Sequence, residues 1–408
     1  MPWFRLARSA GPLLLVLVAA QAPPAYDLVI RGGHVIDPRN GIDGVRDVAI
    51  AAGRVAAVAP RIDAPATARV IDASGLYVTP GLVDIHTHVY AGTGERGSYA
   101  GDNSVYPDGF TFRSGVTTVA DAGGAGWRNF EDFHDRVITR SKTRVLAFLN
   151  IVGHGMRGSA FEHELADMQA APAAETARRY KGTIVGIKTA HYRGPEWTPV
   201  ERAVEAGTLA DIPVMVDFGR DYPERPLEDL LLRKLRPGDI YTHLYSGLRR
   251  ELVDGAPNPA LAAARARGVF FDVGHGNGSF RWRIAQPIVK GGFLPDSIST
   301  DLHTSSMNSA MKSQLEVMSK FLALGESLPQ VVAQASWHPA RQIKQDGLGH
   351  LGVGVDADIA VLRVERGTFG FIDNDNVRYP GTERLACELT LRAGAVVYDL
   401  NGRAATGM

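Results

Sequence analysis

The chain has 408 residues, of which 45% are hydrophobic and 22% are charged, and this composition excludes a disordered, fibrous or membrane-embedded protein. Forty-four Lys and Arg residues balance forty-four Asp and Glu residues, so no basic field is present to attract a nucleic acid. The single cysteine, Cys387, excludes an internal disulfide and a zinc site made of thiolates. Any metal ion must therefore be held by His, Asp, Glu or Lys side chains.

The first residues of the chain have the pattern of a secretory signal peptide. Arg5 and Arg8 precede an apolar run at residues 13–20, and small residues follow around Ala22. The apolar run is much shorter than the roughly 20 residues that a membrane span requires. We therefore expect residues 1–22 to direct export to the periplasm or the medium, and we expect no stable membrane span.

Short β-strands are predicted at both ends of the chain. Residues 27–71 and 358–398 contain alternating apolar and polar residues in short runs that Gly and Pro separate. Because isolated short strands bury too little surface to be stable, we expect the two ends to fold together. The prediction is a small β-sandwich domain made of residues 23–79 and 345–408, and two separate β appendages are the alternative.

The region between these ends, residues 80–344, is predicted to have an α/β fold. Apolar, β-branched segments alternate with segments of helical periodicity, which matches a (β/α)8 TIM barrel in number and in length. The predicted strands are residues 82–83, 116–119, 145–149, 184–187, 213–216, 239–242, 269–271 and 297–299. Helical periodicity is present, for example, in residues 129–140, 199–208 and 311–324.

Polar residues suited to metal binding or catalysis follow directly after these predicted strands. In a (β/α)8 barrel the carboxyl ends of the strands converge on one mouth, so residues distant in sequence meet there. The residues are His86, His88, Asp121, Asn150, Lys188, Asp217, His243, Asp272, His275, Asp301 and His303. The pattern therefore predicts one polar site at the mouth of the barrel.

His86, His88 and Lys188 are the clearest candidates for metal binding. Residues i and i+2 of a strand point to the same side, so the imidazoles of His86 and His88 can reach one ion. A lysine that loses its proton can react with carbon dioxide to form a carbamate, whose two oxygens suit a bridge between ions about 3.5–4 Å apart. The alternative for Lys188 is an ordinary ammonium group that reaches solvent or pairs with an acid.

Short motifs along the chain are similar to those of a known family. They are PGLVDIHTH at 80–88, GIK at 186–188, YTH at 241–243, FDVGHGNGSF at 271–280, STD at 299–301, GVDADI at 354–359 and YDLNG at 398–402. This set resembles the amidohydrolase superfamily of metal-dependent hydrolases, and within it the dihydroorotase-like amidohydrolase/deacetylase group. The resemblance implies that His86, His88 and Asp301 hold one metal ion. It also implies that His243 binds a second ion and that carboxylated Lys188 bridges the two.

Asp217 departs from the family pattern, which has a histidine after the fifth strand. A carboxylate can still bind zinc and is preferred by harder ions such as manganese. We therefore expect two divalent metal ions, zinc or manganese, with Asp217 as a ligand of the second. The added negative charge should make the centre acidify its bound water less. The alternative is that Asp217 only packs or pairs and that a single ion binds.

The expected chemistry is hydrolysis by a water molecule that the two ions activate. The ions would lower the pKa of this water and polarise a carbonyl oxygen of a small-molecule substrate. Asp301 is the predicted catalytic residue, because it can take the water proton and deliver it to the leaving group. The family resemblance indicates an amide or ester of a small acylated compound, such as an N-acyl amino acid, or a cyclic amide.

Substrate binding is predicted for Tyr192, Arg220, His275 and His303, which follow the predicted strands. Arg220 could clamp a carboxylate, and His275 or Tyr192 could polarise a carbonyl, but each could equally form local hydrogen bonds in a loop. Two other functions are left open: a different hydrolase on this fold, such as a deaminase or phosphotriester hydrolase, and a binding protein without catalysis. The sequence also leaves open whether the chain forms a homo-oligomer.

Overall fold

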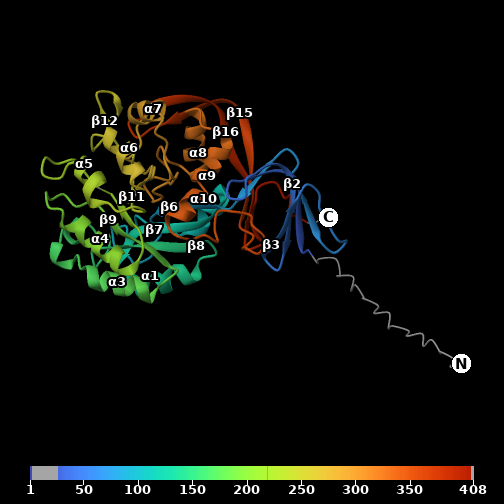
Figure 1. The fold of residues 1–408 in the computed structure, drawn as a ribbon, viewed down its shortest axis with the longest axis horizontal. Helices are drawn as coiled ribbons and strands as arrows, with labels where there is room; N and C mark the ends of the chain where they lie inside the picture. Colours follow the sequence, from blue (N-terminus) through green and yellow to red (C-terminus); the bar gives the residue numbers. More distant parts are fainter. Residues whose placement is uncertain (2–25, 218, 406–408) are drawn as a thin grey trace.

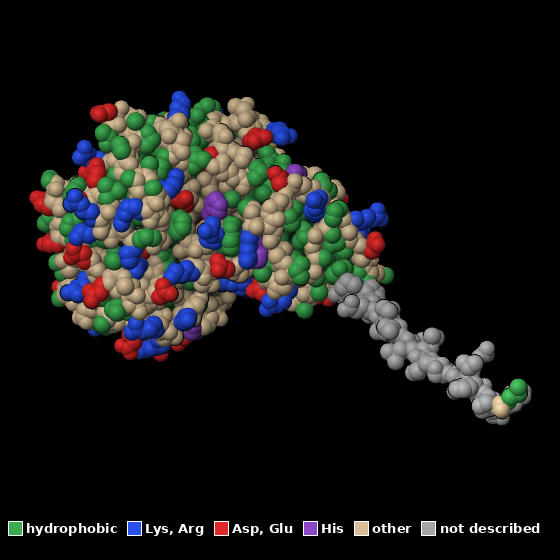
Figure 2. Space-filling model, in the orientation of Figure 1, with side chains coloured by type: hydrophobic (Ala, Val, Ile, Leu, Met, Phe, Trp, Pro, Cys, Tyr) green, Lys and Arg blue, Asp and Glu red, His purple; other side chains and the backbone are tan. Residues whose placement is uncertain are grey.

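The computed structural model describes Met1, residues 26–217 and residues 219–405. The predicted signal peptide, apart from Met1, lies outside the described residues. Over the ranges that are described, no helix combines the length and the apolar character needed to cross a membrane. Figure 2 shows Lys and Arg side chains interspersed with Asp and Glu side chains over the visible face.

One sheet combines strands from both ends of the chain, and eight strands belong to it in the described residues. They are β1 (Leu28–Asp37), β2 (Ile42–Ala51), β3 (Arg54–Ala59), β4 (Arg69–Asp72), β5 (Tyr77–Pro80), β15 (Ile359–Ile372), β16 (Arg378–Arg392) and β17 (Ala395–Asp399). Strand β5 joins the two groups, because it pairs in parallel with β1 and antiparallel with β15. Val78 lies opposite Val361 across the β5–β15 pair, and both are buried in the core of this sheet. The predicted β-sandwich is not confirmed, because these strands form one continuous sheet.

Strands β15 and β16 form a long antiparallel hairpin whose far end lies beside helices α7 (Trp282–Lys290) and α8 (Gln314–Ala323), as Figure 1 shows. The backbone N–H of Leu385 in β16 donates a hydrogen bond to the Ser319 hydroxyl of α8, at 3.0 Å. The Trp282 indole donates to the carbonyl of Phe371 in β15, at 3.1 Å. The C-terminal part of the chain therefore also packs on the α/β region.

The α/β region is built on a curled sheet of parallel strands, seven of them in the described residues. In chain order, which is also their order in the sheet, they are β6 (Leu82–Thr87), β7 (Val116–Gly126), β8 (Arg144–Asn150), β9 (Ile184–Thr189), β10 (Val214–Val216), β11 (Ile240–Tyr241) and β14 (Phe270–Phe271). Strands β6, β7 and β9 are buried along their whole length, as expected for parallel strands that are covered on both faces. Seven of the eight predicted strands are thus confirmed.

The predicted eighth strand, residues 297–299, is not a strand in the structure. Instead, isolated parallel bridges join Ser297 to Asp272, just after β14, and Leu302 to Thr87 in β6. The segment therefore lies between the last and the first strand of the sheet, held by single bridges. This position brings Asp301 next to β6, which carries His86.

Helices connect and cover the parallel strands. Their bounds are α1 (Phe130–Arg136), α2 (Ser159–Glu162), α3 (Ala170–Arg179), α4 (Thr198–Ala210), α5 (Leu227–Asp229), α6 (Pro259–Ala266), α9 (Leu328–Gln334) and α10 (Trp337–Gln342), with 3-10 turns at Pro107–Gly109, Phe112–Ser114, Ile138–Arg140 and Leu165–Asp167, a π turn at Leu230–Lys234 and a small hairpin of β12 (Leu252–Val253) and β13 (Ala256–Pro257). Helix α8 begins three residues later than the periodicity of 311–324 suggests, because Ser313 caps it by accepting a hydrogen bond from Glu316 N–H.

Candidate metal centre

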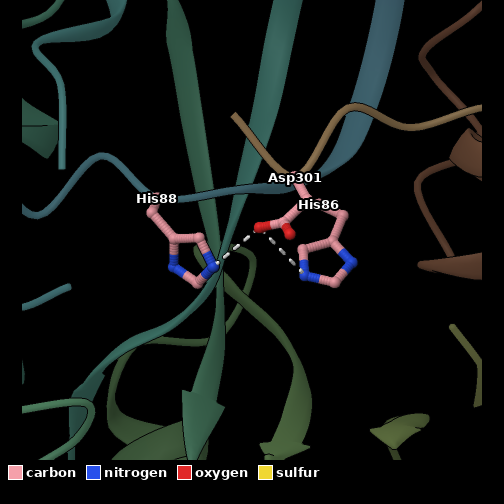
Figure 3. A group of neighbouring side chains, drawn as sticks. All are labelled: His86, His88 and Asp301. Carbon is pink, nitrogen blue, oxygen red and sulfur yellow. Dashed lines mark ion pairs between the residues drawn. The ribbon is translucent and has the colours of Figure 1, made fainter. Parts of the chain in front are cut away.

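His86, His88 and Asp301 converge where β6 ends beside the segment that follows residue 297. One ligand atom from each residue lies within 4.8 Å of the other two, and all three residues are buried or nearly so. Asp301 Oδ1 is 3.1 Å from His88 Nε2 and 3.8 Å from His86 Nε2, so the carboxylate lies between the two imidazoles, as Figure 3 shows. Two imidazole nitrogens and a carboxylate oxygen are a donor set that fits a divalent ion such as zinc.

The protonation states of this group suit metal binding. Burial alone would raise the pKa of Asp301, but the neighbouring His86 and a hydrogen bond from His88 outweigh it and hold that pKa well below its usual range. Burial, reinforced by Lys188, lowers the pKa of His86 to about 3. An anionic carboxylate and a neutral imidazole are the forms that bind a metal ion.

Lys188 lies at the end of β9, fully buried beside the same group. Its Nζ atom is 3.1 Å from His86 Nε2. Burial lowers the pKa of Lys188, because a lone ammonium loses hydration there. The structure therefore brings Lys188 to the site and favours the neutral amine, which is the form that reacts with carbon dioxide.

Asp217 and His243 meet after strands β10 and β11. Asp217 Oδ2 lies 3.3 Å from His243 Nε2. Asp217 Oδ1 accepts a hydrogen bond of 2.6 Å from a guanidinium nitrogen of Arg249, a side chain that is almost fully buried. Burial would raise the pKa of Asp217, but His243 and Arg249 lower it well below its usual value. Asp217 is thus an anion with one oxygen held by Arg249 and the other facing His243.

Hydrogen bonds fix the orientation of two of the imidazoles. His86 Nδ1 is 2.9 Å from the Thr242 hydroxyl, which in turn donates to Asp272 at 2.7 Å. His243 Nδ1 donates to the carbonyl of Gly274 at 2.6 Å. Both rings therefore present Nε2 to the site, and such a second hydrogen bond is usual for histidines that bind metal ions.

Gly276 lies against the carboxylate of Asp301 and has a left-handed backbone conformation, with φ of +53°. A Cβ atom at this position would lie 2.3 Å from Asp301 Oδ2. A side chain here would displace Asp301, so the close approach requires glycine.

The four residues predicted to bind substrate have different positions. His303 is buried near the site, with its ring 6.2 Å from that of His88, and neither ring nitrogen has a hydrogen-bond partner among the described residues. Arg220 is exposed.

His275 and Tyr192 form hydrogen bonds with other residues of the protein. His275 is buried with both ring nitrogens engaged, one with the Gly276 carbonyl at 2.9 Å and the other with Lys320 Nζ at 2.6 Å. The Tyr192 hydroxyl donates to Glu196 at 2.5 Å. These two residues are held by partners within the protein. Such packing of a loop at a strand end is not visible in a sequence.

Three residues that the sequence analysis missed lie at the centre. His191 follows β9 and has Nε2 3.5 Å from Asp217 Oδ2. The Tyr99 ring lies 4.2 Å from that of His88 and 5.2 Å from that of His303. Arg249 binds Asp217, as described above. His191 could have been found, because it follows Lys188 by three residues at a strand end, whereas Tyr99 and Arg249 lie in loops without a motif.

The chain is similar to known proteins in both sequence and structure. No family model matches the sequence. The chain is 34% identical over 320 residues to a deacetylase of Agrobacterium fabrum (strain C58), an alignment that covers 76% of both proteins. The structure is similar to that of an adenine deaminase, with a TM-score of 0.82 and 27% identity over 92% of this chain and all of the other. It is also similar to that of a dihydroorotase, with a TM-score of 0.79 and 26% identity over 91% of this chain and 99% of the other.

These similarities extend over most of the chain. The relatives share one superfamily, as the sequence motifs indicated. The chain belongs to the amidohydrolase superfamily and is a metal-dependent hydrolase of carbon–nitrogen bonds.

Proposed function

We propose that this protein removes an acyl group from a small N-acylated compound, such as an N-acyl amino acid, with the help of two divalent metal ions. The observation that carries the proposal is the convergence of His86, His88 and Asp301 at one buried point. The similarity to a deacetylase supports an acyl group as the part that is released.

Zinc fits the first ion best, because two of its three ligands would be imidazole nitrogens, and manganese is the alternative. We propose that Lys188 is carboxylated and bridges this ion to the second, at which Asp217 and His243 would bind. The burial of Lys188 and its 3.1 Å distance from His86 support this role. The carbamate forms when the neutral amine adds to carbon dioxide and releases one proton.

When bound, the ions would supply an acidified water molecule and polarise the carbonyl group of the substrate. Asp301 has the position of the general base, since it would contact both the ion and the attacking water. Its low pKa keeps the carboxylate ionised, which is the form a general base needs. The proton that it would take from the water would then pass to the leaving nitrogen. The contribution of the fold to catalysis would thus be mainly to orient Asp301 and the side chains that bind the metal ions.

Substrate contacts are proposed for His303 and Arg220. Both ring nitrogens of His303 lack a partner among the described residues, so the imidazole is available to a carbonyl or carboxylate of the substrate. Arg220 is exposed and could reach the carboxylate of an N-acyl amino acid. We also propose that residues 1–22 direct export and that residues 297–302 act as the eighth strand position of a (β/α)8 barrel.

The test is a substrate panel with purified protein loaded with Zn²⁺ or Mn²⁺. The panel contains N-acetyl and N-formyl amino acids, the matching esters, dihydroorotate, a hydantoin and adenine. We expect the N-acyl amino acids to be hydrolysed fastest. Addition of a metal chelator should abolish this turnover. Turnover of adenine or of a cyclic amide alone would replace the deacetylase proposal by a deaminase or cyclic amidase.

A further inference from the structure

We infer that His191 is a ligand of the second metal ion and supplies the imidazole nitrogen that the family places at the position of Asp217. This inference rests on the proposed function, because it concerns the same site. It assigns the second ion to His191, His243 and Asp217, together with the bridging Lys188.

The backbone at His191 is unusual in the same way as at two other residues of the centre. His191 has φ of 62°, His243 of 62° and Asp301 of 51°. This left-handed region is uncommon for residues other than glycine, and the surrounding structure must stabilise it. All three residues follow strand ends or the segment beside β6, so His191 shares both its place and its backbone conformation with two predicted ligands.

The distances in this cluster match those between ligands of a single ion. Asp217 Oδ2 is 3.5 Å from His191 Nε2 and 3.3 Å from His243 Nε2. Two donors at zinc-bond distances lie roughly 3.3–3.6 Å apart in a tetrahedral site. Asp217 Oδ2 is therefore close enough to both imidazoles for one ion to contact all three residues after small side-chain movements.

The hydrogen bonds of His191 orient it as those of the other imidazoles do. His191 Nδ1 donates to Oε2 of Glu162 at 2.5 Å, and the side chain of Glu162 is buried. A carboxylate that holds the second nitrogen of a histidine is a common partner of metal-binding imidazoles. His243 has an equivalent bond to the carbonyl of Gly274.

This orientation calls for a cation, either a proton or a metal ion, between the imidazoles and Asp217. With both Nδ1–H groups engaged, neutral His191 and His243 would each turn a lone pair toward Asp217 Oδ2. Arg249 already binds the other oxygen of Asp217, so it does not separate these acceptors. A metal ion or a proton between them would remove the repulsion, and two nitrogens with one oxygen suit a zinc ion.

A simple His191–Glu162 ion pair is the alternative, and the chain offers a matched control for it. His34 Nε2 is also 2.5 Å from a carboxylate, that of Asp43, in the sheet formed by the chain ends. Replacement of His191 or of His34 by alanine removes one histidine–carboxylate pair in each case. Only the loss of His191 should affect metal binding.

The experiment measures metal binding in wild type, His191→Ala, His191→Gln and His34→Ala. Metal-free proteins are dialysed against graded Zn²⁺, and the bound equivalents are determined by elemental analysis. The visible absorption spectrum of each Co²⁺-loaded protein reports on the nitrogen ligands. We expect two equivalents in wild type and in His34→Ala. Both His191 variants should keep the first equivalent and bind the second at least about 10-fold more weakly, with a changed spectrum only for that second ion.

Other results contradict the inference. Unchanged affinity for the second ion in both His191 variants would exclude His191 as a ligand, as would the loss of both equivalents in both variants. A wild type that binds one equivalent, retained in His191→Ala, would also overturn the inference and leave a one-metal hydrolase. A wild type that binds no ion would instead overturn the proposed function.

Discussion

At Asp217 the chain has a negative side chain where the family has a neutral one, and the structure shows what offsets the charge. The guanidinium of Arg249 lies 2.6 Å from Asp217 Oδ1, and the Arg249 side chain is only 2% exposed. The Asp217–Arg249 pair has the net charge of a neutral imidazole. The expectation of a less positive centre considered Asp217 alone, so it does not hold once Arg249 is included.

The pair leads to a prediction for Asp217→His. This change leaves the buried Arg249 without its carboxylate, and breaking a buried pair by removing one partner is costly. We expect the free energy of unfolding of the metal-free protein to fall by about 3 kcal/mol, measured by denaturant unfolding. The double variant Asp217→His/Arg249→Met should recover most of that loss. Equal stability of Asp217→His and wild type would show that the pair does not stabilise the fold.

Asp301→Asn separates metal binding from proton transfer. The amide oxygen can still contact an ion, but it cannot accept the proton of the attacking water. We expect near-normal metal content and a turnover lower by roughly 10²–10⁴, which is the usual effect of losing an acid–base group. Steady-state kinetics and elemental analysis of the same sample provide the measurement. A decrease of only severalfold would assign the base to another residue.

The loop after β14 holds the Asp301 side chain in position, because Gly276 of this loop lies against its carboxylate. Gly276→Ala adds a Cβ atom 2.3 Å from Asp301 Oδ2 at a residue with φ of +53°. We expect turnover to fall by about 10²-fold, because a displacement of about 1 Å in a catalytic group has that effect. Gly278→Ala is the matched control, since nothing lies within 4 Å of its Cβ position. Equal turnover of both variants would mean that this loop does not hold Asp301.

A helix or strand could be predicted where its own residues show a clear pattern, and it was missed where its formation depends on residues elsewhere in the chain. Buried parallel strands such as β8 and β9 are continuous apolar runs, so the sequence predicted them well. Strand β5 was missed because Tyr77–Pro80 has only four residues and ends in proline. At the C-terminal end the sequence predicted only short strands at 358–362, 389–392 and 396–398, whereas β15 and β16 are much longer, because exposed polar residues occupy the middle of this hairpin.

The residues of the site also differ in how far the sequence alone could identify them. His86 and His88 were found because both lie in one short motif, and Asp301 was found through the family resemblance. Arg249 gains its role only from contact with Asp217, which is 32 residues away along the chain. Sequence spacing does not report such contacts.

At the scale of the whole molecule, strands from both ends are joined to the α/β region. Arg144 of β8 forms ion pairs with Asp356 at 2.7 Å and with Asp358 at 2.6 Å, just before β15. Phe371 and Leu385 of the terminal hairpin belong to the main core. We therefore expect the two parts to unfold together, as one transition in scanning calorimetry whose calorimetric and van't Hoff enthalpies agree. Two resolved transitions would show independent domains.

The central claim is that hydrolysis requires metal ions, the first of them held by His86, His88 and Asp301. Titration of metal-free protein with Zn²⁺ tests this claim most directly. Turnover of an N-acetyl amino acid is followed while bound zinc is counted in the same samples. We predict negligible turnover without metal, a rise as zinc binds and a plateau at two equivalents. His86→Ala should bind less zinc and stay inactive at every concentration. Full turnover in the metal-free protein, or in His86→Ala, would contradict it.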